Sequence, residues 1–145
     1  EILQYFKQQG KSITVLLAGA SPSNKVLKLN DHKNVTISGW VDDIRVSYAQ
    51  GKVFVAPLFI GTGLQNKLLE AMSLNVPCVT TSLVNNALGA QHQKHVLVAD
   101  NIKSFCKNID ILLSSDQRVN NMTQEAKQFI EEKYNWKSVT EKIPF

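Results

Sequence analysis

The chain has 145 residues, 43% of them hydrophobic and 19% charged, and its formal net charge is +4. This length supports one domain with a sizeable core, and the ordinary composition excludes an intrinsically disordered chain. No apolar run reaches the roughly 20 residues that a membrane-spanning helix needs. The positive charge favours anionic partners such as nucleotides, an acidic membrane surface or nucleic acid, although lysines scattered for solubility explain it equally well.

The first part of the chain alternates helices with strands. Residues 1–9 predict the last turns of a helix that Gly10 ends. Residues 13–18 and 35–38 predict strands, because β-branched side chains are frequent in both segments. A turn at 21–23 begins a short helix between these strands.

A second helix is predicted after the loop at 39–41. Asp42 or Asp43 is expected to cap it, and Gly51 ends it. The side chains that we expect to be buried are Val26, Leu27 and Leu29 in the short helix and Ile44, Val46, Tyr48 and Ala49 in this one.

The central stretch, residues 53–81, predicts a strand, a glycine loop, a helix and a second strand. Residues 53–56 form an apolar run that suits a buried parallel strand. Gly61 and Gly63 allow a tight turn and the close approach of a ligand. A helix is expected from about Leu64, and residues 76–81 predict the next strand. A loop between a parallel strand and a helix N-terminus favours anions, so we expect a phosphate group there.

The last third of the chain is predicted to be mainly helical. Residues 82–90 predict a loop with at most one helical turn, and residues 95–99 predict a short strand. One helix is expected after a cap at Asp100 or Asn101, and another after a cap at Asp116. A final segment, residues 135–143, follows them.

Five strands alternating with about seven helical segments indicate an α/β domain with a doubly wound, Rossmann-like parallel sheet. Such sheets bind ligands beyond the carboxyl ends of their strands. We therefore expect the loops at Gly19, Gly39, 57–63 and Ser82 to lie along one edge and to form one crevice.

Several residues at this edge are candidates for ligand binding. Glu70 lies in the helix after the glycine loop, and its carboxylate can accept hydrogen bonds from two sugar hydroxyls. The alternative is a surface acid paired with Lys67 or close to Ser73. Lys67 itself either meets a phosphate or faces solvent. The ring of Trp40 either lies against a base or closes the core.

The histidines and cysteines do not suggest catalytic chemistry. His32, His92 and His95 share no spacing that is typical of a metal site or a triad, so we interpret them as structural or solvent-facing. Cys78 and Cys106 are far apart, and we expect them to be buried reduced thiols in a cytoplasmic protein.

An ordered set of motifs covers nearly the whole chain. The matching segments are residues 17–19, 35–43, 53–57, 61–72 and 76–81, followed by Ala126, Tyr134 and Trp136. In this order they resemble the C-terminal, donor-binding domain of family-4 (group 1) glycosyltransferases, which have the GT-B fold.

The resemblance implies a role for each part of the loop edge. Glu70 matches the glutamate that holds the ribose hydroxyls of the nucleotide. The segment around Gly61, including Gly63, Leu64 and Gln65, matches the loop whose amides bind the donor diphosphate. The turn of Gly39, Trp40 and Val41 matches the segment that contacts the base. The implied activity is transfer of a sugar from a nucleotide-diphospho-sugar with retention of configuration, without a metal ion or another cofactor.

Two features depart from the family pattern. Thr62 stands where the family often has a glutamate that meets the donor sugar. The family domain also normally begins with a further strand, which would lie between the strands at 13–18 and 53–56. Either the sheet closes up differently, another chain fills the gap, or the chain is a piece of a longer protein that also has an N-terminal acceptor domain.

We therefore expect residues 1–145 to be a single donor-binding domain, part of a two-domain cytoplasmic glycosyltransferase of surface polysaccharide or glycoconjugate synthesis. We expect peripheral contact with the inner face of the membrane and no binding of nucleic acid, since no basic stripe is interleaved with aromatic residues. The alternative is a non-catalytic α/β interaction module whose basic surface binds an anionic partner or membrane.

Overall fold

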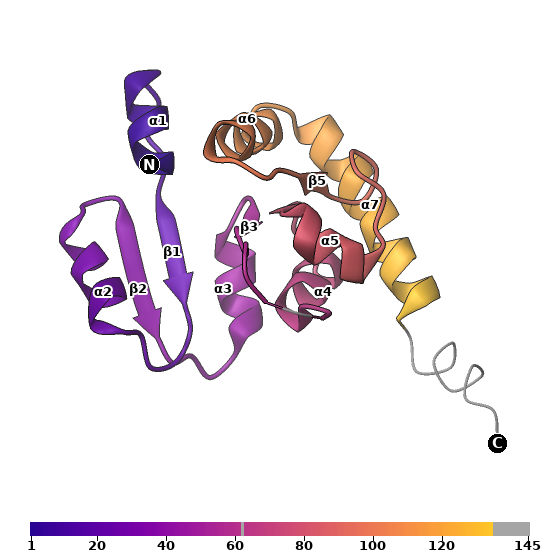
Figure 1. Ribbon diagram of the computed structural model, residues 1–145, viewed down its shortest axis with the longest axis horizontal. Helices are drawn as coiled ribbons and strands as arrows, with labels where there is room; N and C mark the ends of the chain where they lie inside the picture. The colour runs from indigo at the N-terminus through magenta and orange to yellow at the C-terminus, as the bar shows by residue number, and fades with distance from the viewer. Residues whose placement is uncertain (62, 135–145) are drawn as a thin grey trace. The chain divides into compact units, whose positions relative to one another are not determined.

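The computed structural model describes residues 1–61 and 63–134 (Figure 1). The chain divides into two compact units, residues 1–51 (unit 1) and residues 52–145 (unit 2). The final segment predicted at 135–143 lies outside the described residues. No helix in the described part of the chain is long and apolar enough to cross a membrane.

Unit 1 contains two parallel strands. Its elements are α1 (Ile2–Gln8), β1 (Val15–Ala18), α2 (Asn24–Leu27), a 3₁₀ helix η1 (Lys28–Asp31), β2 (Val35–Gly39) and α3 (Ile44–Gln50). Val15 lies opposite Val35, and the register shifts once so that Ala18 lies opposite Gly39. The carboxylate of Asp43, and not that of Asp42, caps α3 by accepting a hydrogen bond from the backbone N–H of Arg45.

The expectation that the helices of unit 1 bury apolar faces is wrong for most positions. Leu27, Leu29, Ile44, Val46 and Ala49 are exposed, and Val26 is half-buried; Tyr48 alone of the predicted set is buried. A two-stranded sheet offers little surface for a helix to cover, so apolar spacing in these short helices does not lead to burial.

The described residues of unit 2 form three parallel strands and four helices. Its elements are β3 (Phe54–Ala56), α4 (Asn66–Ser73), β4 (Cys78–Thr80), α5 (Ser82–Leu88), β5 (Leu97–Val98), α6 (Ile102–Leu113) and α7 (Asp116–Lys133). The strand order is β3-β4-β5. All three side chains of β4 are buried, because this strand has a neighbour on each side and α4 and α6 pack against it. Cys78 and Cys106 are free and buried, as predicted.

Residues 82–88 form a helix where the sequence predicted a loop. The hydroxyl of Thr81 caps α5 at its start, and Gly89 ends it in the left-handed conformation at φ +69°. Val84 and Leu88, four residues apart, are both buried. These features outweigh the low helix propensity of the asparagines within the segment.

Other boundaries also differ from the predictions. α4 begins at Asn66 and not at Leu64. Ser115, and not Asp116, caps α7. Asn101 caps α6 in a capping box with Ser104, which settles the choice between Asp100 and Asn101.

The parallel α/β class is confirmed, but the strands form two sheets. β1 pairs with β2 in one sheet, and β3, β4 and β5 form the other. Among the described residues, β1 and β3 therefore each have one hydrogen-bonded neighbour strand. This division falls where the family pattern has a further strand.

Candidate functional site

The glycine loop connects the end of β3 to the start of α4, as predicted. Gly61 has φ +135° and Gly63 has φ +83°. L-amino acids rarely adopt these conformations, so the loop requires glycine at both positions. A Cβ added at either position would meet no atom within 4 Å, so backbone conformation and not crowding sets the requirement. The open space beside both residues lets a ligand approach the main chain.

The N-terminus of α4 favours a negatively charged group. Gln65 is the N-cap residue but makes no side-chain cap hydrogen bond, and the first turn holds no acidic residue. The first N–H groups of a helix have no intrahelical partners, and the helix dipole adds partial positive charge there. Lys67 lies in the first turn and is exposed. This end of α4 can therefore receive an anion such as a phosphate.

Glu70 lies on the exposed face of α4. The opposite face is buried and consists of Leu68, Ala71 and Met72. The hydroxyl of Ser73 donates to the main-chain carbonyl of Glu70 at 2.8 Å. Cα–Cβ bonds in a helix tilt toward its N-terminus, which for α4 is the end that follows the glycine loop. The position of Glu70 suits a ligand that extends from the loop along α4.

Two hydroxyl groups at the end of β4 and just after it bind the main chain at the end of β3 and just after it. The hydroxyl of Thr80 donates to the carbonyl of Ala56 at 3.2 Å, and that of Thr81 donates to the carbonyl of Leu58 at 2.6 Å. Both threonines are fully buried. Neither threonine was predicted to act at the site, although two threonines at the end of a strand, before an apolar i, i+4 pair, were a usable signal.

Asp100 binds the start of α5 beside these threonines. Its carboxylate accepts hydrogen bonds from the backbone N–H of Ser82 at 2.8 Å and from the Ser82 hydroxyl at 2.5 Å. These two bonds stabilise the charged form and lower the pKa of Asp100. A carboxylate at this helix N-terminus also interacts favourably with the dipole. Asp100 therefore acts as an additional cap for α5.

The residues predicted to contact a base lie in unit 1. Gly39 has φ +65°, and its carbonyl accepts a hydrogen bond from the backbone N–H of Gly19 at 3.1 Å, which joins the loops after β1 and β2. The side chain of Trp40 is 70% exposed, so it does not close the core, and Val41 is half-buried. The residues predicted to bind the rest of the donor, from Gly61 to Glu70, lie in unit 2.

Asp43 and Arg45 form an ion pair one turn beyond Trp40. The guanidinium Nη2 lies 2.8 Å from a carboxylate oxygen of Asp43. Hydrogen bonds from Arg45 lower the pKa of Asp43 and keep its carboxylate charged. The pair fixes the start of α3, immediately after the loop of residues 39–41.

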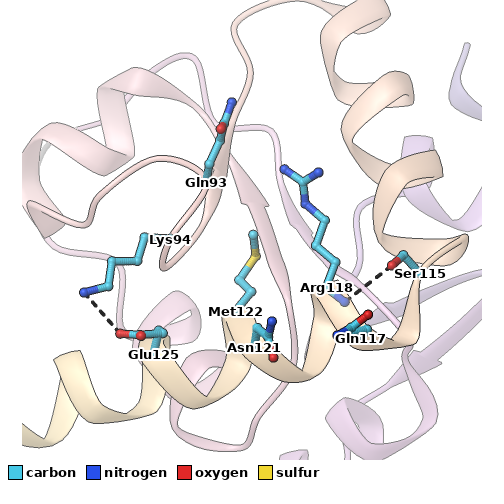
Figure 2. Close-up of a pocket in the computed structure, with 8 residues that line it drawn as sticks. All are labelled: Gln93, Lys94, Ser115, Gln117, Arg118, Asn121, Met122 and Glu125. Atoms are coloured by element: carbon cyan, nitrogen blue, oxygen red, sulfur yellow. Dashed lines mark hydrogen bonds and ion pairs between the residues drawn. The ribbon is translucent and has the colours of Figure 1, made fainter.

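A hollow of about 440 Å³ lies elsewhere in unit 2, between the segment before β5 and the start of α7 (Figure 2). Met122 points into it, and Lys94 forms an ion pair with Glu125 at 3.2 Å along its wall. The strands of unit 2 are parallel. A segment that enters β5 therefore lies at the opposite sheet edge from a loop that leaves β3. None of the residues lining the hollow was predicted to bind a ligand.

Comparison with known proteins identifies the family. Residues 1–115 match the family model described as glycosyl transferases group 1. An uncharacterized 44.6 kDa protein in the cps region of Klebsiella pneumoniae is 26% identical over 110 residues, which are 76% of this chain and 28% of that protein. The chain thus spans between a quarter and a third of that relative.

Two solved structures show the same fold. A glycosyltransferase from Rickettsia africae ESF-5 has a TM-score of 0.81 at 13% identity, over 97% of this chain and 41% of that one. Anabaena Alr3699/HepE in complex with UDP has a TM-score of 0.79 at 15% identity, over 96% and 41% of the two chains. The chain belongs to the group 1 glycosyltransferases and has the fold of the C-terminal half of a GT-B enzyme.

Proposed function

We propose that this chain is the donor-binding part of a retaining glycosyltransferase that takes a nucleotide-diphospho-sugar as donor. The observation that carries the proposal is the strand–glycine loop–helix of β3 and α4. Gly61 and Gly63 open the backbone to a ligand, the first turn of α4 holds no acidic residue, and Glu70 follows on the exposed face. Family membership and the UDP bound to the similar Anabaena protein support the same assignment.

The chemistry of the donor suits these groups. The diphosphate carries negative charge, which increases when the bond to the sugar breaks. The amides of Gly63, Leu64 and Gln65 and the dipole of α4 would stabilise this charge, with Lys67 as a further cation. Glu70 would accept hydrogen bonds from the ribose hydroxyls, and residues 39–41 would contact the base. Thr62, which lies outside the described residues, lacks the carboxylate that the family often has there.

Catalysis on this proposal depends on positioning and electrostatics. We assign no side chain in this chain as a nucleophile or as a general base. Holding the donor so that its leaving diphosphate faces a helix N-terminus lowers the barrier to bond cleavage. The proposed mechanism needs no metal ion, and the acceptor would bind to an N-terminal domain. The name of the Klebsiella relative, a protein in a cps region, supports a role in surface polysaccharide or glycoconjugate synthesis at the cytoplasmic side of the membrane.

Calorimetric titration with UDP, GDP and their sugar conjugates tests the proposal. The chain is expected to bind at least one of these nucleotides. Replacement of Glu70 by Ala should weaken binding about tenfold, the scale expected when a charged hydrogen-bond partner is lost. Glu125→Ala is the matched control, because Glu125 is also an exposed helical glutamate but lines the hollow of Figure 2.

Two results would contradict the donor site. The first is a folded chain that binds none of the nucleotides. The second is a loss of affinity in Glu125→Ala with none in Glu70→Ala, which would move the site to the hollow. If the chain binds no nucleotide but binds vesicles that contain anionic lipid, the non-catalytic interaction module becomes the better interpretation.

A further inference from the structure

Two buried hydroxyl groups bind the main chain at the place where β3 ends and the glycine loop begins. Among the described residues of the chain, the buried polar side chains are Thr80, Thr81 and Thr123. Two of these three donate hydrogen bonds to the main chain where it leaves β3. A buried hydroxyl is costly unless it is hydrogen-bonded, so both threonines hold their acceptors firmly.

The two threonines hold different parts of the chain. Thr80 binds the carbonyl of Ala56, which is its register partner in the sheet and which also accepts from the N–H of Leu58. This position is fixed by strand pairing even without the hydroxyl. Thr81 binds the carbonyl of Leu58, two residues beyond the end of β3. The hydrogen bond of Thr81 therefore constrains a loop residue that strand pairing does not hold in place.

The hydroxyl of Thr81 also orders α5. It accepts a hydrogen bond from the backbone N–H of Val84 at 3.3 Å while it donates its single proton to Leu58 at 2.6 Å. A hydroxyl that makes both bonds has a fixed orientation. The Leu58 carbonyl is thus tied to the first turn of α5, which Asp100 also caps through Ser82.

The loop beyond Leu58 has two contrasting parts. The ring of Phe59 packs edge-on against that of Phe105 at 6.2 Å between centroids. The next two residues, Ile60 and Gly61, are exposed. Glycine restricts its own backbone less than any other residue does, so the course of the loop depends more strongly on how its first residues are held.

We propose that Thr81 is a positioning residue for the phosphate-binding loop, acting through the Leu58 carbonyl. This inference rests on the proposed function, because it assigns Thr81 to the same donor site. A loop fixed at Leu58 presents its amides to the diphosphate with less conformational entropy to lose on binding. Thr81 itself is fully buried, so we assign it an indirect role through the Leu58 carbonyl and no contact with the donor.

Three variants of the chain separate positioning from ordinary stabilisation. Thr81→Val removes the hydroxyl and keeps the branched shape, Thr81→Ser keeps the hydroxyl, and Thr80→Val removes the neighbouring buried hydroxyl as the matched control. We expect Thr81→Val to bind UDP about tenfold more weakly, since small displacements of binding groups have effects of this order or larger. Thr81→Ser should retain affinity. Thr80→Val should unfold at lower urea concentration with its UDP affinity unchanged.

Amide hydrogen exchange of the free chain gives a readout that does not depend on the nucleotide. In Thr81→Val the segment 58–65 should exchange faster, whereas in Thr80→Val its rate should match the wild type. If Thr81→Val does not fold, Thr81→Cys, which keeps a weak donor at similar size, replaces it in the comparison.

The two proposals fail in different ways. A wild-type chain without UDP affinity contradicts the donor site, and the exchange rates still decide the role of Thr81. Wild-type affinity and unchanged exchange in Thr81→Val would overturn the positioning role. Equal effects of Thr80→Val and Thr81→Val on both measurements would also overturn it, because they would show general loosening of β4.

Discussion

The two sheets of this chain have the same parallel pairing but differ in how well they are covered. The three residues of β4 are all buried, whereas the four residues of β1 are all half-buried. β4 has a hydrogen-bonded neighbour on each side and is covered by α4 and α6, while β1 pairs with β2 alone among the described strands. Burial follows the number of neighbours, and not the apolar content of the strand.

The difference indicates that unit 2 has a hydrophobic core of its own, whereas the stability of unit 1 rests on a smaller buried apolar surface. The buried apolar side chains described in unit 1 are Phe6, Val35 and Tyr48. Unit 2 contains the large cluster around β4 and α6, and it also contains the glycine loop, α4 and Glu70. The proposed phosphate and ribose contacts therefore belong to the better-packed unit. An isolated two-stranded sheet is at best marginally stable, so we expect unit 1 to open more readily.

The largest effect is expected when a matched cavity is created in each unit, which tests whether unit 1 opens more readily than unit 2. Phe105 in α6 and Phe6 in α1 are both 1% exposed. Phe105→Ala should lower the free energy of unfolding of unit 2 by about 3–5 kcal/mol, which is typical for a buried phenylalanine. Phe6→Ala should accelerate amide exchange in unit 1 and leave the protection of unit 2 close to that of the wild type.

Urea unfolding combined with amide exchange of peptides from each unit measures both effects. Phe6→Ala and Phe105→Ala could instead reduce protection in both units to the same extent, which would contradict the expectation that the units open separately. That result would mean that the chain unfolds as one cooperative body.

A second test uses two glycines with nearly the same backbone conformation. Gly10 in unit 1 has φ +68° and Gly89 in unit 2 has φ +69°. Substitution by Ala should cost about 1–2 kcal/mol at each position, because left-handed conformations disfavour a Cβ. An added Cβ at Gly89 would also lie 2.5 Å from the Nζ of Lys133, which donates to the carbonyl of Leu88 at 2.8 Å. Gly10 has open space at the same point.

We therefore expect Gly89→Ala to lower the melting temperature more than Gly10→Ala. The extra loss comes from the displaced Lys133, which can move because its side chain is flexible. Lys133→Met in the Gly89→Ala background should remove most of this extra loss. Equal melting temperatures for the two glycine variants would show that the Lys133 contact adds nothing.

The sequence predicted unit 2 better than unit 1 for a physical reason. The apolar positions of α4, α6 and α7 repeat over several turns, and most of those in α4 and α6 are buried. In α7, Met122 and Ala126 are buried, and the other apolar positions are half-buried. In α3, Ile44 and Tyr48 have the i, i+4 spacing, but Tyr48 is buried and Ile44 is exposed, because periodicity does not reveal whether a neighbouring surface exists. Five strands were predicted and the described residues form five, whereas the division of these strands into two sheets depends on tertiary pairing.

For the candidate site, too, the local features were predicted from the sequence and the long-range contacts were not. The glycine loop and its position between a strand and a helix follow from local sequence and agree with the structure. Glu70 is exposed, which both of its interpretations allow. The contribution of Thr81 was not predicted, because its partner Leu58 lies 23 residues away in sequence. The assignment of each residue to a part of the donor remains a prediction.

A third test compares serine N-caps in the two units. Ser23 caps α2 and Ser115 caps α7, and each hydroxyl accepts a backbone N–H at 3.4 Å. Ser115→Ala should lower the unfolding free energy by about 1 kcal/mol, since α7 is 18 residues long and packs against α4 and α6. Ser23→Ala should have a smaller effect, because α2 has four residues and buries none of them. Urea midpoints of the two variants measure the difference, and a larger shift for Ser23→Ala would contradict the ranking.

The smallest expected effect is a pH dependence that is confined to unit 2. The ring of His95 stacks on Phe129 at 4.6 Å, and its Nδ1 accepts a hydrogen bond from the backbone N–H of Gln91 at 3.1 Å. Burial lowers the pKa of His95 below its usual value of 6.5, and the charge of Lys94 adds to this effect. The opposing carboxylates that face the ring are Glu125 and Glu132.

The direction in which stability changes with pH follows from the lowered pKa of His95. Well above pH 6.5, His95 is neutral in both the folded and the unfolded chain and contributes no pH dependence. Just below that pH the unfolded chain binds a proton that the folded chain does not, so stability falls as the pH falls. His95→Asn should flatten this part of the curve of melting temperature against pH, while His32→Asn in unit 1 controls for the loss of a histidine. An unchanged slope in His95→Asn would show that the ring nitrogen does not need to stay neutral. The segment before β5 would then be held by its other contacts, including the hydrogen bond from the N–H of Val98 to His92 Nδ1 at 2.9 Å.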